Sequence, residues 1–330
     1  MFEQSFLQSI GAIQHADGRV TFANTTAADC PDAFITLPAG LALLQVAGAD
    51  AADFLHGQLS ADIKALAANA GTPAAWCTPK GRVITTLVVY RHDAAFYLLL
   101  PAQLRERVQK RLQMFVLRAN VQITDSMPGR TLLGVRGRGG AIPEVETDFS
   151  LHELNGRLHL FLPDRHGESR CLIVDETETL QGVWQDLSQA MPAVDSRCWE
   201  RLDMDTGLAW LCEATSEEFL PQELNLDRNG GVSFDKGCYP GQEIIARIRY
   251  RGQVKRRLFL IHAMSHDTPQ PGTAIRDNRG GNQGMIVRAA PGKDKSHIIL
   301  GVLDCAFADT EADSIESFRI LQIRPVNEHG

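Results

Sequence analysis

The chain lacks the cysteine pattern by which disulfide-rich domains and local metal sites are usually recognised. Its seven cysteines are odd in number, scattered along the chain, and never spaced as Cys-x-x-Cys. The sequence therefore indicates neither a disulfide framework nor a local zinc or cluster site. We interpret this cysteine usage as that of a protein in a reducing compartment.

Long apolar runs are also missing. No stretch approaches the length needed to span a bilayer, and residues 1–18 lack the basic start and continuous apolar run of a signal peptide. The sequence thus favours a cytoplasmic protein, or an organellar one from which a transit sequence has been removed.

Positive charge is not in excess. The formal net charge is −7 and the pI is near 5.8, which argues against a protein whose whole surface grips nucleic acid but leaves a local basic patch open. The chain has 330 residues, of which 44% are apolar and 22% charged. This is enough for two or three domains around a sizeable core.

The first region with a clear pattern follows a lead-in over residues 1–40. Runs rich in apolar and β-branched residues alternate with a short helix that Asp50 can cap and a longer helix that opens at Pro101. The order β-α-β-β-α-β predicts the split βαβ of ferredoxin-like folds, with helices on one face of an antiparallel sheet. The predicted strands are 41–46, 83–90, 96–100 and 121–124.

A looser second copy of this unit follows. Its predicted elements are strands at 132–135, 158–162 and 171–174, a helix at 178–190, and a strand at 202–204 that completes the set. After Gly252 the pattern changes to short strands separated by Pro-Gly, Gly-Gly and Asp-containing turns, the last of them at 315–323. The sequence predicts an α+β protein with two tandem ferredoxin-like units, over 1–130 and 131–252, and a small antiparallel β-barrel over 253–330.

The most suggestive chemistry lies in the stretch Lys236-Gly237-Cys238-Tyr239-Pro240-Gly241-Gln242-Glu243. Glycines on both sides of Cys238 allow a tight turn and leave the sulfur uncrowded, while Lys236 and the amides of a helix opening near Gln242 favour the thiolate. The alternative is a buried structural cysteine beside a turn, since free cysteine is among the most buried residue types.

This stretch, together with two others, carries a resemblance to a known family. The others are Leu55-x-Gly57-Gln58-Leu59-Ser60-Ala61-Asp62 and Phe219-Leu220-Pro221-Gln222. The three resemble the YgfZ family, which comprises folate-binding proteins linked to iron-sulfur cluster maintenance and to tRNA modification. That family is related in fold to the aminomethyltransferase, or T-protein, of the glycine cleavage system, so the resemblance implies the aminomethyltransferase folate-binding fold.

The resemblance implies an accessory protein that binds a tetrahydrofolate and has no turnover of its own. Its partners would be iron-sulfur client enzymes, including tRNA-modifying ones, whose clusters it helps to assemble or repair. Cys238 would be the reactive or cluster-contacting group, and Lys236 would tune its thiolate. The loop glycines would shape the turn, and Gln242 and Glu243 would anchor it.

For the folate itself, the resemblance singles out Asp205. It aligns with a position where proteins of this group carry a glutamate that holds the pteridine ring, and a carboxylate there can accept two parallel hydrogen bonds. Aspartate keeps this chemistry with a shorter reach, and a plain exposed or capping aspartate is the competing interpretation. The expected folate-binding residues are Asp205, Gly237, Tyr239, Gly241, Gln242, Glu243 and Arg247.

A basic tract, Arg247 to Arg257, follows the cysteine loop and holds six cations in eleven residues. It suits the glutamate tail of a folate, a phosphate backbone such as that of tRNA, or an acidic protein partner. A structural alternative is that these cations lie at a domain junction and pair with carboxylates. A tRNA-binding or protein-docking module is therefore one alternative function.

A second alternative is a folate-dependent aminomethyl transferase or demethylase. The related transferases carry an acid in the strand after a glycine turn, but here the strand after Gly81 offers Thr85 and Thr86. Threonine is a poor substitute for a titratable group in proton transfer. The ten histidines, His56 among them, fall in unrelated elements, so we expect them to be surface or satisfied polar residues and expect no metal site.

Overall fold

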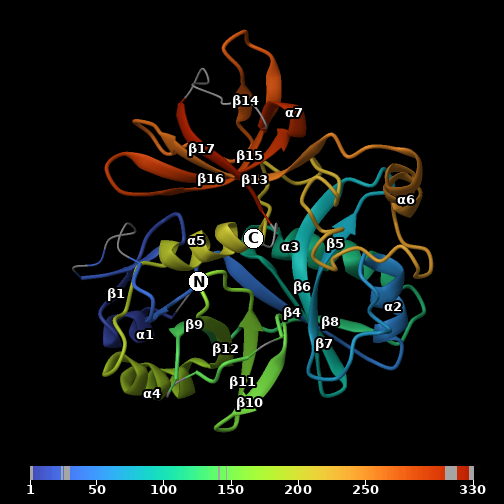
Figure 1. The fold of residues 1–330 in the computed structure, drawn as a ribbon. Coiled ribbons are helices and arrows are strands. Elements are labelled where there is room, and N and C mark those ends of the chain that lie inside the picture. Colours follow the sequence, from blue (N-terminus) through green and yellow to red (C-terminus); the bar gives the residue numbers. More distant parts are fainter. Residues whose placement is uncertain are drawn as a thin grey trace.

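The computed structural model describes residues 3–23, 25, 30–139, 142–145, 147–308 and 318–326. Three five-stranded antiparallel sheets organise the chain, together with a small hairpin of two strands. In Figure 1 the C-terminal sheet lies at the top, and the other two lie side by side beneath it. The antiparallel α+β architecture expected from the sequence is confirmed.

The first sheet has the strand order β5-β6-β7-β4-β8. Four of its strands, with helices α2 and α3, form the predicted split βαβ, and β5 adds an edge strand that was not predicted from the sequence. Pro73 of β5 is tolerated because the strand pairs on one side only. The elements are β4 (Leu41–Ala47), α2 (Ala51–Gln58), β5 (Gly71–Cys77), β6 (Val83–His92), β7 (Ala95–Pro101), α3 (Ala102–Val116) and β8 (Gln122–Asp125).

The second sheet has the order β10-β11-β12-β9-β3, and one of its edges comes from the lead-in. Strand β3 pairs antiparallel with β9, where Ile35 lies opposite Val135. The lead-in, grouped by sequence with the first unit, thus packs on the second. The elements are α1 (Gln4–Ser9), β1 (Ala12–Gln14), β2 (Val20–Phe22), β3 (Phe34–Thr36), β9 (Arg130–Gly137), β10 (Leu151–Leu154), β11 (Arg157–Leu162), β12 (Ser169–Glu176) and α4 (Thr177–Ser188).

The strand expected at 202–204 is wrong: this segment lies inside helix α5 (Arg197–Thr206). Cys198, Trp199 and Leu202 recur at helical spacing and are all buried. The helix ends at Gly207, whose φ of 79° is the left-handed cap that glycine adopts most easily. A three-residue apolar run is too short to distinguish a strand from a helix, and β3 fills the place that this strand was expected to take.

The two larger units pack face to face. Leu43, Val88 and Leu99 of the first sheet share a buried cluster with Leu132 and Leu172 of the second. The helices cover the outer faces, α2 and α3 on the first sheet and α1 and α4 on the second. This gives four layers, in the order helix, sheet, sheet, helix.

The third sheet, with strand order β14-β15-β16-β13-β17, packs against α5 and against the core of the first unit. Its end strands β14 and β17 are not paired with each other among the described residues, so the described part forms an open sheet. The start of the strand predicted at 315–323 lies outside the described residues. The elements are β13 (Arg256–Met264), β14 (Ala274–Arg276), β15 (Asn282–Pro291), β16 (Ser296–Asp304), α7 (Cys305–Ala308) and β17 (Arg319–Pro325).

A long connection, residues 207–241, carries the chain from α5 back across the first unit without a helix or strand. Backbone hydrogen bonds join Phe219 and Glu217 to Val83 at the start of β6, at 2.8 and 2.7 Å. Farther along, the hydroxyl of Ser60 donates to the carbonyl of Gly231 at 2.6 Å. The connection is thereby held against β6 and the end of α2, where the cysteine loop begins.

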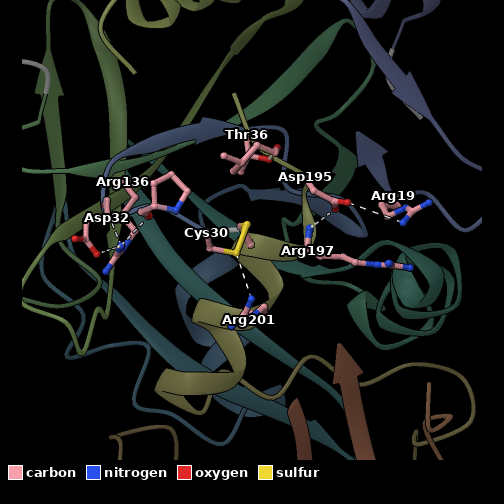
Figure 2. The surroundings of a disulfide bond; sticks show 11 residues. Arg19, Cys30, Asp32, Thr36, Arg136, Asp195, Arg197 and Arg201 are labelled. Carbon is pink, nitrogen blue, oxygen red and sulfur yellow. Dashed lines mark hydrogen bonds and ion pairs between the residues drawn. A yellow bond between two sulfur atoms is a disulfide. The ribbon is translucent and has the colours of Figure 1, made fainter. Parts of the chain in front are cut away.

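Two cysteines form a disulfide that the spacing of the cysteines did not predict. Cys30, in the lead-in, is bonded to Cys198 of α5 across 168 residues of sequence. Figure 2 shows the bond beside Arg201, whose guanidinium donates to the Cys30 sulfur at 3.5 Å. The expectation of a chain without disulfides is wrong on this point, because the pairing depends on the lead-in packing on the second unit. Among the described residues, no helix is long and apolar enough to cross a membrane.

Candidate functional site

The cysteine loop lies between the C-terminal end of α2 and the N-terminal end of α6 (Gln242–Arg251). Lys236 fixes its first end: the ammonium group donates to the carbonyl oxygen of Leu59 at 2.6 Å and also to that of His56. The last carbonyls of a helix have no partners within it and attract cations. Lys236 therefore closes α2 and ties the loop to it.

Lys236 is buried, with 8% of its surface exposed. Burial lowers its pKa to about 8, although the nearby Asp62 carboxylate acts in the opposite direction. The ammonium also lies 4.7 Å from the ring centre of Tyr239, within the range of a cation–π contact. The side chain was expected to tune the Cys238 thiolate; its contacts in the structure are with α2 and Tyr239.

Tyr239 forms the second anchor of the loop. Its ring is buried, and its hydroxyl has no hydrogen-bond partner within the described part of the chain. Burial, with a smaller effect from the neighbouring Cys77, raises its pKa. Cys77 itself is fully buried, and burial raises its thiol pKa to about 12. Tyr239 thus packs into the core behind the loop, away from solvent.

Gly241 fixes the far end of the loop. Its φ is 82°, and a Cβ there would lie 2.5 Å from the Cα of Gly81 and 2.6 Å from the carbonyl oxygen of Thr78. Only glycine allows this approach between the loop and the β5–β6 turn. The side chain of Gln242 donates to the carbonyl of Lys236 at 3.4 Å, so the two ends of the loop are joined.

Cys238 is exposed between these anchors. The interpretation of a buried structural cysteine is therefore wrong. Gly237, next to it, is also exposed, and α6, with Glu243 in its first turn, begins directly after the loop. The arrangement holds an accessible sulfur in place through buried neighbours, which suits a thiol that acts as a nucleophile or a ligand.

His56 belongs to this site, although its sequence context predicted an ordinary polar residue. Its Nε2 atom would lie 3.7 Å from a Cβ at Gly237, and its Nδ1 atom lies 3.2 Å from the Asp62 carboxylate without the alignment of a hydrogen bond. Burial, followed by the charge of Lys236, lowers its pKa. Its neighbours in the Leu55–Asp62 motif were the available signal.

Asp205 lies apart from the loop, at the end of α5. Its carboxylate pairs with Arg324 of β17 and with His166, the latter at 2.9 Å. The loop residues contact α2 and the β5–β6 turn instead. The folate-binding residues expected from the sequence therefore fall into two groups, Asp205 in one and the loop with α6 in the other.

The cations of the basic tract also fall into two groups. Arg257 is half-buried and holds Asp227 through two hydrogen bonds, at 2.6 and 3.0 Å, while donating to the Gln222 carbonyl. It joins β13 to the long connection, as the structural alternative anticipated. The other cations of the tract, Arg247 among them, are exposed. Within the described ranges, no group of three or more His, Cys, Asp or Glu side chains is placed to hold a metal ion.

The fold and this site define a class of protein. The architecture is that of the aminomethyltransferase T of the glycine cleavage system: the Bartonella henselae protein superposes with a TM-score of 0.70 at 16% identity, over 88% of this chain and 85% of that one. Thr85 and Thr86 occupy the strand after Gly81, and their buried hydroxyls donate to backbone carbonyls. The chain is an aminomethyltransferase-fold protein with an exposed cysteine loop.

Sequence comparison narrows this class to one family. The tRNA-modifying protein YgfZ of Edwardsiella ictaluri is 31% identical over 282 residues, covering 82% of this chain and 84% of that protein. Its counterpart in Pectobacterium carotovorum is 30% identical over 73% of this chain and 74% of that protein. No family model matches the chain. The chain belongs to the YgfZ family of tRNA-modifying proteins, as the three motifs indicated.

Proposed function

We propose that this protein is a tetrahydrofolate-binding accessory factor that supports the assembly or repair of iron-sulfur clusters in client enzymes, including tRNA-modifying ones. The observation that carries the proposal is the exposed Cys238 on a loop fixed by Lys236, Tyr239 and Gly241. A thiolate is the form in which cysteine binds metals and attacks sulfur. On this proposal the protein works in the cytoplasm, beside its clients.

The strand after Gly81 supports an accessory role over aminomethyl transfer. Thr86 donates to the Ala209 carbonyl at 2.5 Å and Thr85 to the carbonyl of Thr86 at 2.9 Å, so both hydroxyls are already engaged. Neither is a titratable group suited to proton transfer at neutral pH. A one-carbon transferase would need a proton acceptor from elsewhere in the chain.

The folate is assigned to Asp205. Its carboxylate has two oxygens that pair with His166 and Arg324, and both partners are partly exposed side chains. These oxygens have the acceptor chemistry that the paired N–H donors of a pteridine ring require. The ring would replace one or both cations on the carboxylate. Bound folate would supply a one-carbon carrier at the end of α5.

The functional test measures the activity of a four-iron four-sulfur enzyme in cells that lack this gene. The cells carry the wild-type protein, Cys238→Ser or Cys212→Ser at equal abundance. Cys212 is a partly exposed cysteine outside the loop and serves as the matched control. We expect rescue by wild type and Cys212→Ser only. Equal rescue by Cys238→Ser would reduce the loop to a structural element and overturn the proposal.

The folate assignment has its own test. Equilibrium dialysis with a tetrahydrofolate should give an affinity at least about tenfold weaker for Asp205→Asn, because a charge-assisted pair of hydrogen bonds is lost. Asp175→Asn, at another ion-paired surface carboxylate, should bind as wild type does. Unchanged affinity in Asp205→Asn would remove the folate from this position.

A further inference from the structure

Two helices of this acidic chain carry a run of cations, and the structure treats them differently. On α3 all four basic side chains form ion pairs: Arg105 pairs with Asp125, Lys110 with Glu106, and Arg107 and Arg111 share Glu217. The run on α3 is thus a solvated helix face whose cations are all paired with nearby carboxylates.

On α6 the charges are not balanced. Arg247, Arg249 and Arg251 are exposed, and within the described ranges none of them forms an ion pair. The same holds for Lys255 and Arg256, which follow the helix. Cations in the last turn stabilise a helix through its dipole, but Arg247 lies a turn earlier and the last two lie beyond the helix end. The helix alone does not account for five unpaired cations on a chain with a net charge of −7.

Aromatic side chains lie among these cations. Tyr250 is 68% exposed, unusual for a tyrosine. Its ring meets that of Phe234 edge to face at 6.2 Å, and the Arg249 guanidinium lies 5.4 Å from the centre of the same Phe234 ring. Phe234 therefore holds Tyr250 and Arg249 in place while the Tyr250 ring remains open to solvent.

We propose that the outer face of α6, formed by Arg247, Arg249, Tyr250 and Arg251, binds an unpaired segment of RNA. Unpaired cations suit a phosphate backbone, and an exposed aromatic ring on the same face suits the stacking of an unpaired base. A base-paired duplex offers phosphates but no free base face, and an acidic protein offers charge but no base. The combination on α6 favours single-stranded RNA over both.

The position of this face relates it to Cys238. Helix α6 has ten residues, about 15 Å at 1.5 Å per residue, and it begins directly after the cysteine loop. RNA bound along its outer face would pass within about one helix length of the exposed sulfur. The choice of RNA among polyanions rests on the proposed function, since the relatives of this chain are tRNA-modifying proteins.

The experiment measures fluorescence anisotropy of a labelled RNA hairpin with an unpaired loop, as a function of salt, for the full chain. Arg247→Glu, Arg249→Glu and Arg251→Glu are combined in one variant. Arg118→Glu, Arg276→Glu and Arg279→Glu form the control variant, which changes three exposed cations elsewhere by the same charge. We expect the first variant to bind the hairpin more weakly. The magnitude of its slope of log association constant against log salt concentration should fall by about 2, because each of the three lost phosphate contacts contributes about 0.7. The control should match wild type.

Tyr250→Ala and Tyr250→Phe test the stacking. Loss of one stacked base predicts a weakening of about tenfold for the alanine variant, while phenylalanine retains a ring and should bind within about twofold of wild type. Equal binding by the two charge-reversal variants, equal affinity for a blunt RNA duplex, or equally effective competition by a poly-glutamate peptide would each overturn the proposal.

These outcomes are separable from those of the proposed function. Cys238→Ser should bind the hairpin as wild type does, because its side chain is outside the α6 face. If that variant also rescues the cluster enzyme, the proposed function fails while the RNA result stands. If the α6 variants bind RNA as wild type does and only wild type rescues the cluster enzyme, the RNA proposal fails while the proposed function stands.

Discussion

The ammonium nitrogen of Lys236 lies 2.6 Å from the carbonyl oxygen of Leu59, the residue at which α2 ends. One side chain thereby caps a helix of the first unit and fixes the loop that presents Cys238. The two residues are 177 positions apart in sequence. The geometry of the exposed sulfur therefore depends on a contact between distant parts of the chain.

Lys236→Met should destabilise the protein. Methionine keeps the length and the apolar stem but leaves the carbonyls of His56 and Leu59 without a donor, and we expect the free energy of unfolding to fall by about 2 kcal/mol. Urea denaturation measures it. Lys80→Met, an exposed lysine in the adjacent turn, should stay within about 0.5 kcal/mol of wild type. Equal stability of the two variants would show that the cap contributes nothing.

The stability should depend on pH through Lys236. Burial lowers its pKa to about 8 from the ordinary 10.5, so between these values the unfolded chain binds a proton that the folded protein has released. The free energy of unfolding therefore rises from pH 8 to 10.5, by at most about 3 kcal/mol. The measurement is the difference between wild type and Lys236→Met across this range.

Taking the difference in unfolding free energy between wild type and Lys236→Met cancels the contribution of other titratable groups. Burial raises the thiol pKa values of Cys77 and Cys171 to about 12 from 9.0, which lowers the stability of both proteins alike above pH 9. A difference between wild type and variant that stays flat from pH 8 to 10.5 would argue against a lysine whose pKa is lowered by burial.

Gly241→Ala should damage the loop more than its backbone angle alone explains. Gly230 has the same φ of 82° with nothing near its Cβ position, whereas at Gly241 a Cβ meets the backbone of Gly81 at 2.5 Å. We expect Gly230→Ala to cost about 1 kcal/mol of unfolding free energy and Gly241→Ala about 3 kcal/mol or more. Similar costs for both would mean that the β5–β6 turn moves aside easily.

Arg257→Met should destabilise the protein, unlike a substitution at an exposed cation of the basic tract. Breaking its largely buried pair with Asp227 leaves a carboxylate without its partner, and we expect a loss of about 3 kcal/mol in unfolding free energy. Arg256→Met, at the exposed neighbour, should change stability by less than about 0.5 kcal/mol. Thermal denaturation of both variants checks this; a stable Arg257→Met protein would contradict the structural role.

The disulfide predicts a thiol count. Without reductant, denatured protein should show five titratable thiols out of seven cysteines, and all seven after reduction. Reduction should also lower the melting temperature, since a bond across so long a loop typically contributes about 2–5 kcal/mol. Seven thiols in air-oxidised protein would mean that Cys30 and Cys198 lie close together without bonding.

Much of the first unit was predictable because its strands are long and rich in β-branched residues. The run at 83–90 matches β6, and the helix after Pro101 matches α3. Strand β5 was missed because Gly71, Pro73 and two alanines give it little strand character, and its stability comes from pairing with β6. Local pattern alone carries no signal for such an edge.

The site was predictable in its residue types and not in its contacts. The loop glycines and Cys238 stand together in sequence, so their pattern was visible. The anchors were not, because Lys236 reaches α2 and Gly241 reaches the β5–β6 turn only after folding. The role expected for Lys236 rested on its closeness to Cys238 in sequence, whereas its carbonyl partners lie on another element. The Cys30–Cys198 pair was hidden for the same reason.

Strand β3 has a consequence for how the chain can be divided. One edge strand of the second sheet comes from residues 34–36, whereas its other strands start only at residue 130. A fragment cut at the boundary between the two units would expose the unpaired edge of β9 and lose one partner of the disulfide. The second unit is therefore discontinuous in sequence, and only a rearranged chain in which the lead-in is moved directly ahead of β9 would encode it as one continuous segment.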